Sequence, residues 1–346
     1  MNDPETPLSA SRIKTAQSCS WLYWCKYKLN LPDASNDGAK RGSICHLIFE
    51  LLGVSKRKSI YSKIIKSKNV FSVPSIEKLI MKHAKALEVD DDANIELIKE
   101  MTLNGLMYDF YGKKIGKPNQ ALSEQDFEIV VNKEGKRYKI KGFIDKLFLY
   151  KKNQFALIRD FKTSKKKFEG KEVTDNLQDY MYSLASRHLY PEYKNRVSEF
   201  LFLKFDLDES CESSDGAIRM NPISEDDLDG FEYQLSEIQK YLDNFSEQDA
   251  MANFAASLPF PTDNSFSGPL QCGFAKTKGQ LKKDGALMWH CPMKFEFDYY
   301  AVINKDGKHI KSYIVSEFNE SLIPEGGTAE KRHYAGCPRF NKSAYA

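Results

Sequence analysis

Hydrophobic residues recur at helical spacing in several stretches of the chain. The first of these, residues 9–30, is also rich in aromatic side chains. A polar turn at 32–40 follows it, and the sequence then predicts a helix that opens at Arg41-Gly42-Ser43, with Ser43 as its N-cap. Further helices are expected as a pair within 74–112, where an acidic turn separates them, and singly over 174–189 and 224–246.

Strands are predicted where apolar and polar positions alternate or where short apolar runs lie between turns. A Lys-Glu-Gly turn at 133–135 and a polar break at 151–154 divide one region into three strands, which we expect to be consecutive and antiparallel. An Asp306-Gly307 turn between two apolar runs indicates a β-hairpin near the end of the chain. The predicted strands lie at 127–131, 138–150, 155–161, 200–205, 295–303 and 309–316.

This mixture of elements predicts an α/β fold, a central mixed sheet flanked by helices. The helices predicted within about 55–120 interrupt the core and are expected to form a helical insert. Residues 1–215 would then form the core. Residues 216–346 would add a C-terminal helix and hairpin region that packs back on it.

The formal net charge of +3 is small, so composition by itself does not indicate a nucleic-acid-binding protein. Lysines gather at 162–171 and 276–283, but such runs are ordinary solvated surface unless a site lies beside them. No stretch approaches the roughly 20 apolar residues of a membrane span. The polar N-terminus lacks the pattern of a secretion signal. We therefore expect a cytoplasmic protein with no membrane partner.

The strongest chemical motif is Gly142-Phe143-Ile144-Asp145, followed one hairpin later by Asp160-Phe161-Lys162. Side chains alternate along a strand, so Asp160 and Lys162 share a face, with Asp145 on the adjoining strand. Carboxylates and the Phe161 carbonyl suit Mg²⁺ or Mn²⁺. A lysine beside the reacting water orients it and stabilises developing negative charge. The simpler alternative is an ion pair between Asp160 and Lys162.

Two further pairs stand four residues apart on predicted helices and so share a helix face. His46 would supply an imidazole ligand and Glu50 would support it, or His46 is a structural histidine. Gln178 and Tyr182 would support the metal site and contact substrate, or they form a surface polar pair. Glu128 is either an extra acidic ligand or, as we prefer, a solvent-facing strand residue.

In chain order these motifs are Gly-Ser-x-x-His-x-x-x-Glu, Gly-x-x-Asp, Asp-x-Lys-Thr and Gln-x-x-x-Tyr. Their order and separations resemble the RecB-like branch of the PD-(D/E)XK nuclease superfamily, including its stand-alone CRISPR-associated and phage members. The resemblance covers residues 9–205. It implies a restriction-endonuclease-like core and a bacterial or phage-infected host cytoplasm. It also implies that His46, Asp145 and Asp160 bind the metal and that Lys162 is catalytic. Gln178 and Tyr182 would belong to the branch-specific helix.

The chain has seven cysteines and no expected secretion signal, so a disulfide framework is not expected. Many relatives carry an iron–sulfur cluster, and here a [4Fe-4S] cluster would take Cys19, Cys272, Cys291 and Cys337. The later three are more widely spaced than in those relatives. A zinc site that includes His290 and a chain with no metal at the cysteines remain the alternatives. The other three, Cys25, Cys45 and Cys211, are expected to be ordinary thiols.

The resemblance implies a metal-dependent exonuclease that acts on single-stranded DNA or DNA ends in replication, recombination or repair. Lysines 165–167 and 171 would contact phosphates without reading bases, and aromatic side chains would stack on unpaired bases. No P-loop is present, so no helicase motor is expected. The alternatives are a structure-selective endonuclease with the same site, and a catalytically idle module that binds DNA or partner proteins of those complexes.

Overall fold

The computed structural model describes residues 3–33, 36–207, 215–255 and 272–345, so Cys211 lies outside the described part. The chain divides into two compact units. The sheet unit comprises Met1–Ser9 and Ser35–Lys240, and the terminal unit comprises Ala10–Ala34 and Tyr241–Ala346. The division at residue 215 suggested by the sequence stays a prediction. In the described residues, no helix is both long and apolar enough to cross a bilayer.

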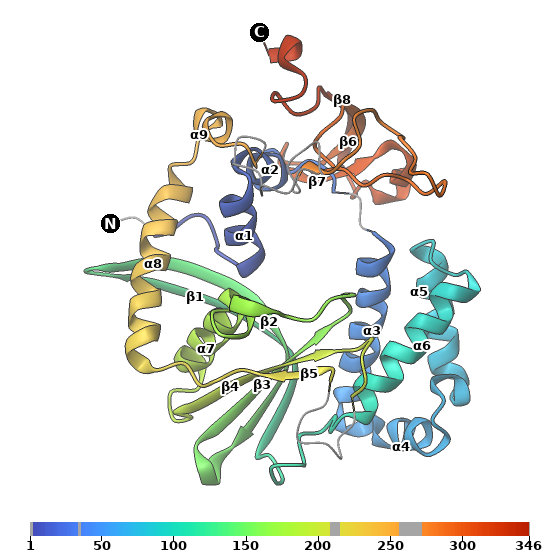
Figure 1. The fold of residues 1–346 in the computed structure, drawn as a ribbon, viewed down its shortest axis with the longest axis vertical. Coiled ribbons are helices and arrows are strands. Elements are labelled where there is room, and N and C mark those ends of the chain that lie inside the picture. The colour runs from blue at the N-terminus through green and yellow to red at the C-terminus, as the bar shows by residue number, and fades with distance from the viewer. Residues whose placement is uncertain (1–2, 34–35, 208–214, 256–271, 346) are drawn as a thin grey trace. The chain divides into compact units, whose positions relative to one another are not determined.

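A five-stranded mixed sheet, in the order β1-β2-β3-β4-β5, forms the centre of the sheet unit (Figure 1). β1 pairs antiparallel with β2 and β2 with β3, which confirms the three predicted consecutive strands. β4 pairs parallel with β3, and α7 (Leu177–Leu189) makes the crossover that a parallel pair requires. The strands are β1 (Gln120–Lys133), β2 (Lys136–Tyr150), β3 (Phe155–Lys162), β4 (Asn195–Phe202) and β5 (Ala217–Arg219).

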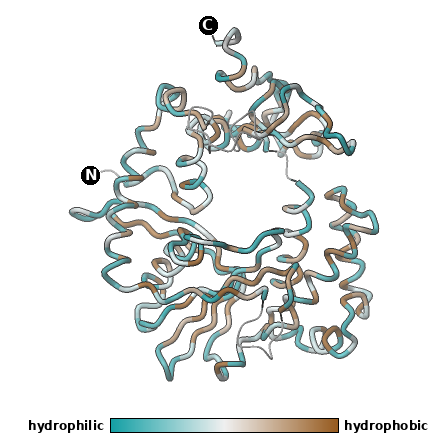
Figure 2. The backbone as a smooth tube through the Cα atoms, in the orientation of Figure 1, coloured by the Kyte–Doolittle hydropathy of each residue, from teal (hydrophilic) through white to brown (hydrophobic). Residues whose placement is uncertain are grey.

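Hydrophobic positions run along these strands and along the neighbouring helices (Figure 2). β3 and β4 are buried almost throughout, as expected for strands covered on both faces. Helices α3 to α6 gather on one side of the sheet in Figure 1 and share a core with Phe161 and Leu201. These helices are α3 (Asp37–Gly53), α4 (Lys58–Ser67), α5 (Pro74–Ala86) and α6 (Asp92–Met107), of which α4 to α6 lie within the region predicted to be a helical insert.

The predicted start of α3 at Ser43 is wrong. The helix begins at Asp37, six residues earlier, because the Asn36 side chain caps it by accepting a hydrogen bond from the Ala39 amide at 3.0 Å. Ser43 lies inside the helix, and its hydroxyl donates to the Lys40 carbonyl at 2.8 Å. The helix α8 (Glu225–Asp243), predicted over 224–246, begins after Ser224, whose hydroxyl accepts a hydrogen bond from the Asp227 amide.

The terminal unit contains short helices and a three-stranded sheet in the order β7-β6-β8. The hairpin of β6 (Phe297–Ile303) and β7 (His309–Ile314) confirms the predicted one, and β8 (Thr328–Tyr334) adds a strand that was not predicted. The prediction of a single helix over 9–30 is wrong. The segment is interrupted at Cys19, whose backbone is extended, and it contains α1 (Ala10–Ser18), α2 (Ser20–Tyr23) and a π-helical turn (Trp24–Lys28).

Hydroxyl side chains before the break explain it. Thr15 donates to the Ser11 carbonyl at 2.8 Å and Ser18 to the Thr15 carbonyl at 3.0 Å. Such bonds compete with the helical pattern and favour a bend. A separate short helix, α9 (Glu247–Ala252), begins at Ser246 with a reciprocal capping box to Asp249.

Candidate active site

Three acidic residues stand in one row across β1, β2 and β3. β1 and β2 are paired on both sides of Glu124, which stands opposite Asp145. The pairing of β2 with β3 ends at Lys146 and Arg159. The next position in the same register sets Asp160 beside Asp145. The backbone of Glu124 has a φ of 47°, in the left-handed region that residues with a Cβ rarely occupy. Local strain of this kind is typical of functional sites.

α3 brings His46 to this row because Gly42 lets the helix approach the end of β3. A Cβ on Gly42 would lie 2.8 Å from the Thr163 hydroxyl oxygen, so a larger residue would push the helix away. His46 lies one turn further along the same helix. The glycine and the threonine of the two sequence motifs are therefore in contact, and this contact sets the position of the imidazole.

The imidazole of His46 lies between two carboxylates and a backbone carbonyl. Its Nδ1 is 3.4 Å from Asp145 Oδ1 and 3.7 Å from Glu124 Oε1, and its Nε2 is 3.2 Å from the Phe161 carbonyl oxygen. Burial lowers the pKa of His46, but the hydrogen bonds to Asp145 and Glu124 outweigh it and raise the pKa to about 10. The site therefore attracts positive charge strongly.

Asp145 is held by its neighbours at both oxygens. Oδ2 accepts a hydrogen bond from the Phe161 amide at 2.7 Å, and Oδ1 faces His46. Burial and the negative charge of Asp160 raise the pKa of Asp145 to about 6, against the lowering effect of His46. Two carboxylates this close favour either a shared proton or a cation.

Gln178 connects the other functional groups through one amide. Its Oε1 accepts from Lys162 Nζ at 2.6 Å, and its Nε2 donates to Asp160 Oδ1 at 2.8 Å. The Tyr182 hydroxyl donates to the same Oδ1 at 2.8 Å. Lys162 Nζ also lies 2.8 Å from Asp160 Oδ2. The ammonium therefore has a hydrogen bond to Gln178 and an ion pair with Asp160, and the Asp160 carboxylate accepts two hydrogen bonds at Oδ1.

Glu124 is the site residue that the motifs missed. The hairpin register indicates it: counting back from the two-residue turn between Lys133 and Lys136 sets Glu124 opposite Asp145. Glu50 is exposed on α3, and His46 contacts Glu124 and Asp145 instead. Glu128 is exposed and pairs with Lys139 at 2.7 Å, which agrees with a solvent-facing strand residue.

The donor set suits a divalent cation. One ligand atom each from His46, Glu124 and Asp145 lies within 4.8 Å of the others. The Phe161 carbonyl oxygen is close by, and the Asp160 Oδ2 atom is buried without a well-aligned hydrogen bond. Carboxylate and carbonyl oxygens with one imidazole are a set that Mg²⁺ or Mn²⁺ accepts. The residues therefore fit such an ion.

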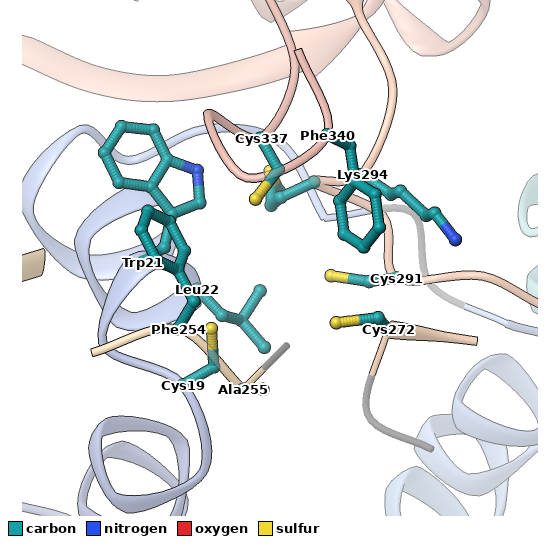
Figure 3. A pocket seen from close by; sticks show the side chains of 11 residues that line it. Cys19, Trp21, Leu22, Phe254, Ala255, Cys272, Cys291, Lys294, Cys337 and Phe340 are labelled. Atoms are coloured by element: carbon teal, nitrogen blue, oxygen red, sulfur yellow. The ribbon is translucent and has the colours of Figure 1, made fainter. Parts of the chain in front are cut away.

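Four cysteines line one apolar pocket in the terminal unit (Figure 3). In that view the sulfur atoms of Cys19, Cys272, Cys291 and Cys337 point into the same space. Burial, with the neighbouring thiols, raises the pKa of Cys291 to about 11 and of Cys337 to about 12. His290 is not a lining residue of this pocket, and its ring packs against Phe295.

The other cysteines with described surroundings do not line that pocket. Cys45 is fully buried in the helical core of the sheet unit, where its thiol accepts from the Thr102 hydroxyl. Cys25 is buried beside Tyr334 in the terminal unit. Both are unpaired thiols, in agreement with the sequence-based interpretation.

Comparisons with known proteins place the chain in a family. The sequence profile of the PD-(D/E)XK nuclease superfamily matches residues 7–273. No curated protein matches the chain. Among solved structures, the crystal structure of SSO0001 is similar at 15% identity over 54% of this chain and 72% of that chain, with a TM-score of 0.23. Because the superfamily profile spans most of the sequence, the chain belongs to the PD-(D/E)XK nuclease superfamily, and membership implies a metal-dependent nuclease.

Proposed function

We propose that this chain is a RecB-like DNA exonuclease that acts on single strands or DNA ends in replication, recombination or repair. One observation carries the proposal: His46, Asp145 and the Phe161 carbonyl gather at the acidic row, and Asp160, Lys162 and Gln178 form a connected network beside them. The four sequence motifs contribute to this region in the order of the RecB-like branch. The substrate and the cytoplasmic location are inferred from that resemblance.

His46, Glu124, Asp145 and the Phe161 carbonyl would hold Mg²⁺ or Mn²⁺, with Asp160 completing the set. When bound, such an ion polarises the scissile phosphate and lowers the pKa of a water. His46 would have to be neutral to hold the ion, because only the neutral imidazole is a ligand. The positive charge of such an ion would offset the repulsion between Asp145 and Asp160.

Lys162 would stabilise the negative charge that develops on the phosphate oxygens during hydrolysis. Gln178 and Asp160 fix its ammonium at 2.6 and 2.8 Å, so little reorientation is needed when substrate arrives. Lys165, Lys166 and Lys171 are exposed shortly after β3 and would contact the phosphates of the strand. Lys167 is already bound to Asp215.

The test is incubation with end-labelled single-stranded DNA and with a closed single-stranded circle, with and without Mg²⁺ or Mn²⁺. We expect the linear strand to shorten from its end only with metal, and the circle to survive. Asp160→Asn and Lys162→Ala should abolish cleavage but retain DNA binding. Glu128→Gln, on the same sheet but paired with Lys139, is the matched control and should cleave normally.

Each alternative has its own result in this assay. Cleavage of the circle would establish a structure-selective endonuclease. Equal products from wild type, Asp160→Asn and Lys162→Ala would contradict catalysis at this site. DNA binding without cleavage under any metal would indicate an idle binding module, one that would act through replication or recombination partners.

We also propose that Cys19, Cys272, Cys291 and Cys337 bind a [4Fe-4S] cluster in a reducing cytoplasm. In the described part of the chain, no three of these sulfurs lie within 4.8 Å of one another. A single tetrahedral zinc ion needs sulfur–sulfur separations of about 3.8 Å. These separations are too wide for a single tetrahedral zinc ion.

A visible absorbance spectrum of protein purified without oxygen tests this assignment. We expect broad absorbance that Cys272→Ala removes and that Cys45→Ala retains, since Cys45 is in the sheet unit. Stoichiometric zinc, or a colourless protein that contains neither iron nor zinc, would refute the cluster.

A further inference from the structure

Residues 272–291 form an arm in the terminal unit, an irregular hairpin that lies between two of the pocket cysteines. Gly273 faces His290, and Leu281 faces Leu287. At the base, the Cys291 amide donates to the Cys272 carbonyl at 3.1 Å, and near the tip the Lys282 amide donates to the Ala286 carbonyl at 2.7 Å. The arm is therefore an ordered element, closed at both ends by backbone hydrogen bonds.

The arm exposes three large apolar side chains. Leu281, Leu287 and Trp289 are 56%, 69% and 55% exposed. Four lysines on the arm are exposed as well, and they are Lys276, Lys278, Lys282 and Lys283. Its acidic residue, Asp284, accepts a hydrogen bond from the Ala286 amide within the turn. Apolar and cationic side chains are thus exposed together between residues 276 and 289.

Trp289 is the most defined of these groups, because the backbone of Gly273 supports its ring. A Cβ on Gly273 would lie 2.7 Å from Trp289 Cε3, and the φ of Gly273 is 73°. The Phe274 amide donates to the Trp289 carbonyl at 3.1 Å, so the backbone of the tryptophan is held as well. An indole that is half exposed and supported from behind can stack on a planar ligand without first being ordered.

We propose that this arm binds single-stranded nucleic acid, with Trp289 stacked on an unpaired base and the lysines on the flanking phosphates. Charge complementarity selects this occupant: aromatic faces between cations are how proteins hold single strands without reading sequence. The inference rests on the proposed nuclease function, and it adds a substrate contact outside the metal site. The arm would bind the strand and take no part in hydrolysis.

Binding is measured by fluorescence anisotropy of an oligothymidylate of about 20 nucleotides, with every variant in the Asp160→Asn background so that the oligonucleotide stays intact. Trp289→Ala should weaken binding about tenfold. Lys282→Ala with Lys283→Ala should lower the slope of log affinity against log salt by about 1.4, from two phosphate contacts. Tryptophan emission of the background protein should fall on titration, and Trp289→Phe should remove that change.

The matched control for the lysine pair is Lys305→Ala with Lys308→Ala, because these residues flank the Asp-Gly turn of the other hairpin in the terminal unit. Tyr233→Ala, at a side chain 61% exposed on α8, is the control for the tryptophan. Both controls should bind as the background does. If arm variants and controls bind equally, the inference is overturned.

The assay also separates this inference from the proposed function. Loss of binding in the arm variants, together with a wild type that cuts no DNA, would refute the nuclease and leave the arm as a binding element. A wild type that cuts DNA, with arm variants unchanged in affinity and salt slope, would refute the arm alone. Binding to vesicles of anionic phospholipid that needs Lys282 and Lys283, with oligonucleotide affinity unchanged, would also overturn it.

Discussion

Lys146 carries a charge that folding opposes, and its replacement by methionine should stabilise the sheet unit. The side chain is 2% exposed, and its ammonium lies 3.6 Å from the ring centroid of Phe110. Burial, and to a smaller degree the positive charge of Arg159, lowers the pKa of Lys146 to about 7. Methionine has a similar length and flexibility but no charge, so Lys146→Met removes the unfavourable group with little change in packing.

The magnitude follows from the pKa shift. The pKa of Lys146 falls from 10.5 in the unfolded chain to about 7 in the folded protein. At about 1.4 kcal/mol for each pKa unit, this lowers the free energy of unfolding by roughly 5 kcal/mol at a pH where Lys146 is protonated in both folded and unfolded chains. Because the shift is the net effect of all interactions of the ammonium, we expect Lys146→Met to raise the free energy of unfolding by up to about 5 kcal/mol at pH values below 7.

The pH dependence has a definite sign. Between about pH 7 and 10.5 the unfolded chain holds a proton that folded Lys146 has lost, so wild-type stability rises with pH in this window. Lys146→Met lacks this rise. Urea unfolding at about pH 6 and about pH 9 measures both effects, with the exposed Lys141→Met as control. A variant less stable than wild type at pH 6, or one with the wild-type pH slope, would refute the reasoning.

Three further predictions test the site and the packing. Gln178→Ala removes the acceptor 2.6 Å from Lys162 Nζ and should lower kcat about 10- to 100-fold. The circular dichroism spectrum should stay the same, and an unchanged kcat would contradict the prediction. Burial raises the pKa of Asp179 to about 6, so the Tm of Asp179→Asn should equal that of wild type below about pH 4 and exceed it above about pH 6. The corresponding gain in the free energy of unfolding is up to about 3 kcal/mol, and parallel Tm–pH curves would contradict it. Tyr334→Phe leaves the buried Trp21 Nε1 without its 2.8 Å acceptor and should cost about 1–3 kcal/mol, measured as faster amide exchange in the terminal unit; unchanged exchange contradicts it.

Elements that depend on short-range patterns could be predicted from the sequence. The antiparallel strands, the helix pair of the insert and the Asp306-Gly307 hairpin each depend on residue periodicity or on turn chemistry within a few residues. β8 was missed because most of its side chains are exposed, so it carries no apolar alternation, and it pairs with β6 across a long connection. The start of α3 was missed because the residues before Ser43 looked like a polar turn, although Asn36 is an equally good cap.

The candidate site could be predicted only in part, because a motif reports residues near one another in sequence. Asp160, Lys162 and Gln178 belong to recognisable motifs, and the structure joins them by hydrogen bonds. Glu124 has no motif around it, and it enters the site through strand pairing and an unusual backbone angle. The convergence of Cys272 and Cys291 depends on the arm between them, which places residues 19 positions apart in direct backbone contact.

The short turn between β1 and β2 sets the register of the acidic row although it lies at the other end of the hairpin. Gly135 adopts a φ of 76° there, a conformation that closes the hairpin between Lys133 and Lys136. A re-pairing of these strands by a single residue would rotate Glu124 to the opposite face of the sheet and bring a serine or a glutamine into its place. This remote glycine therefore governs which side chains stand in the acidic row, and replacing it should change the affinity of the proposed metal site although the loop contacts none of that site's residues.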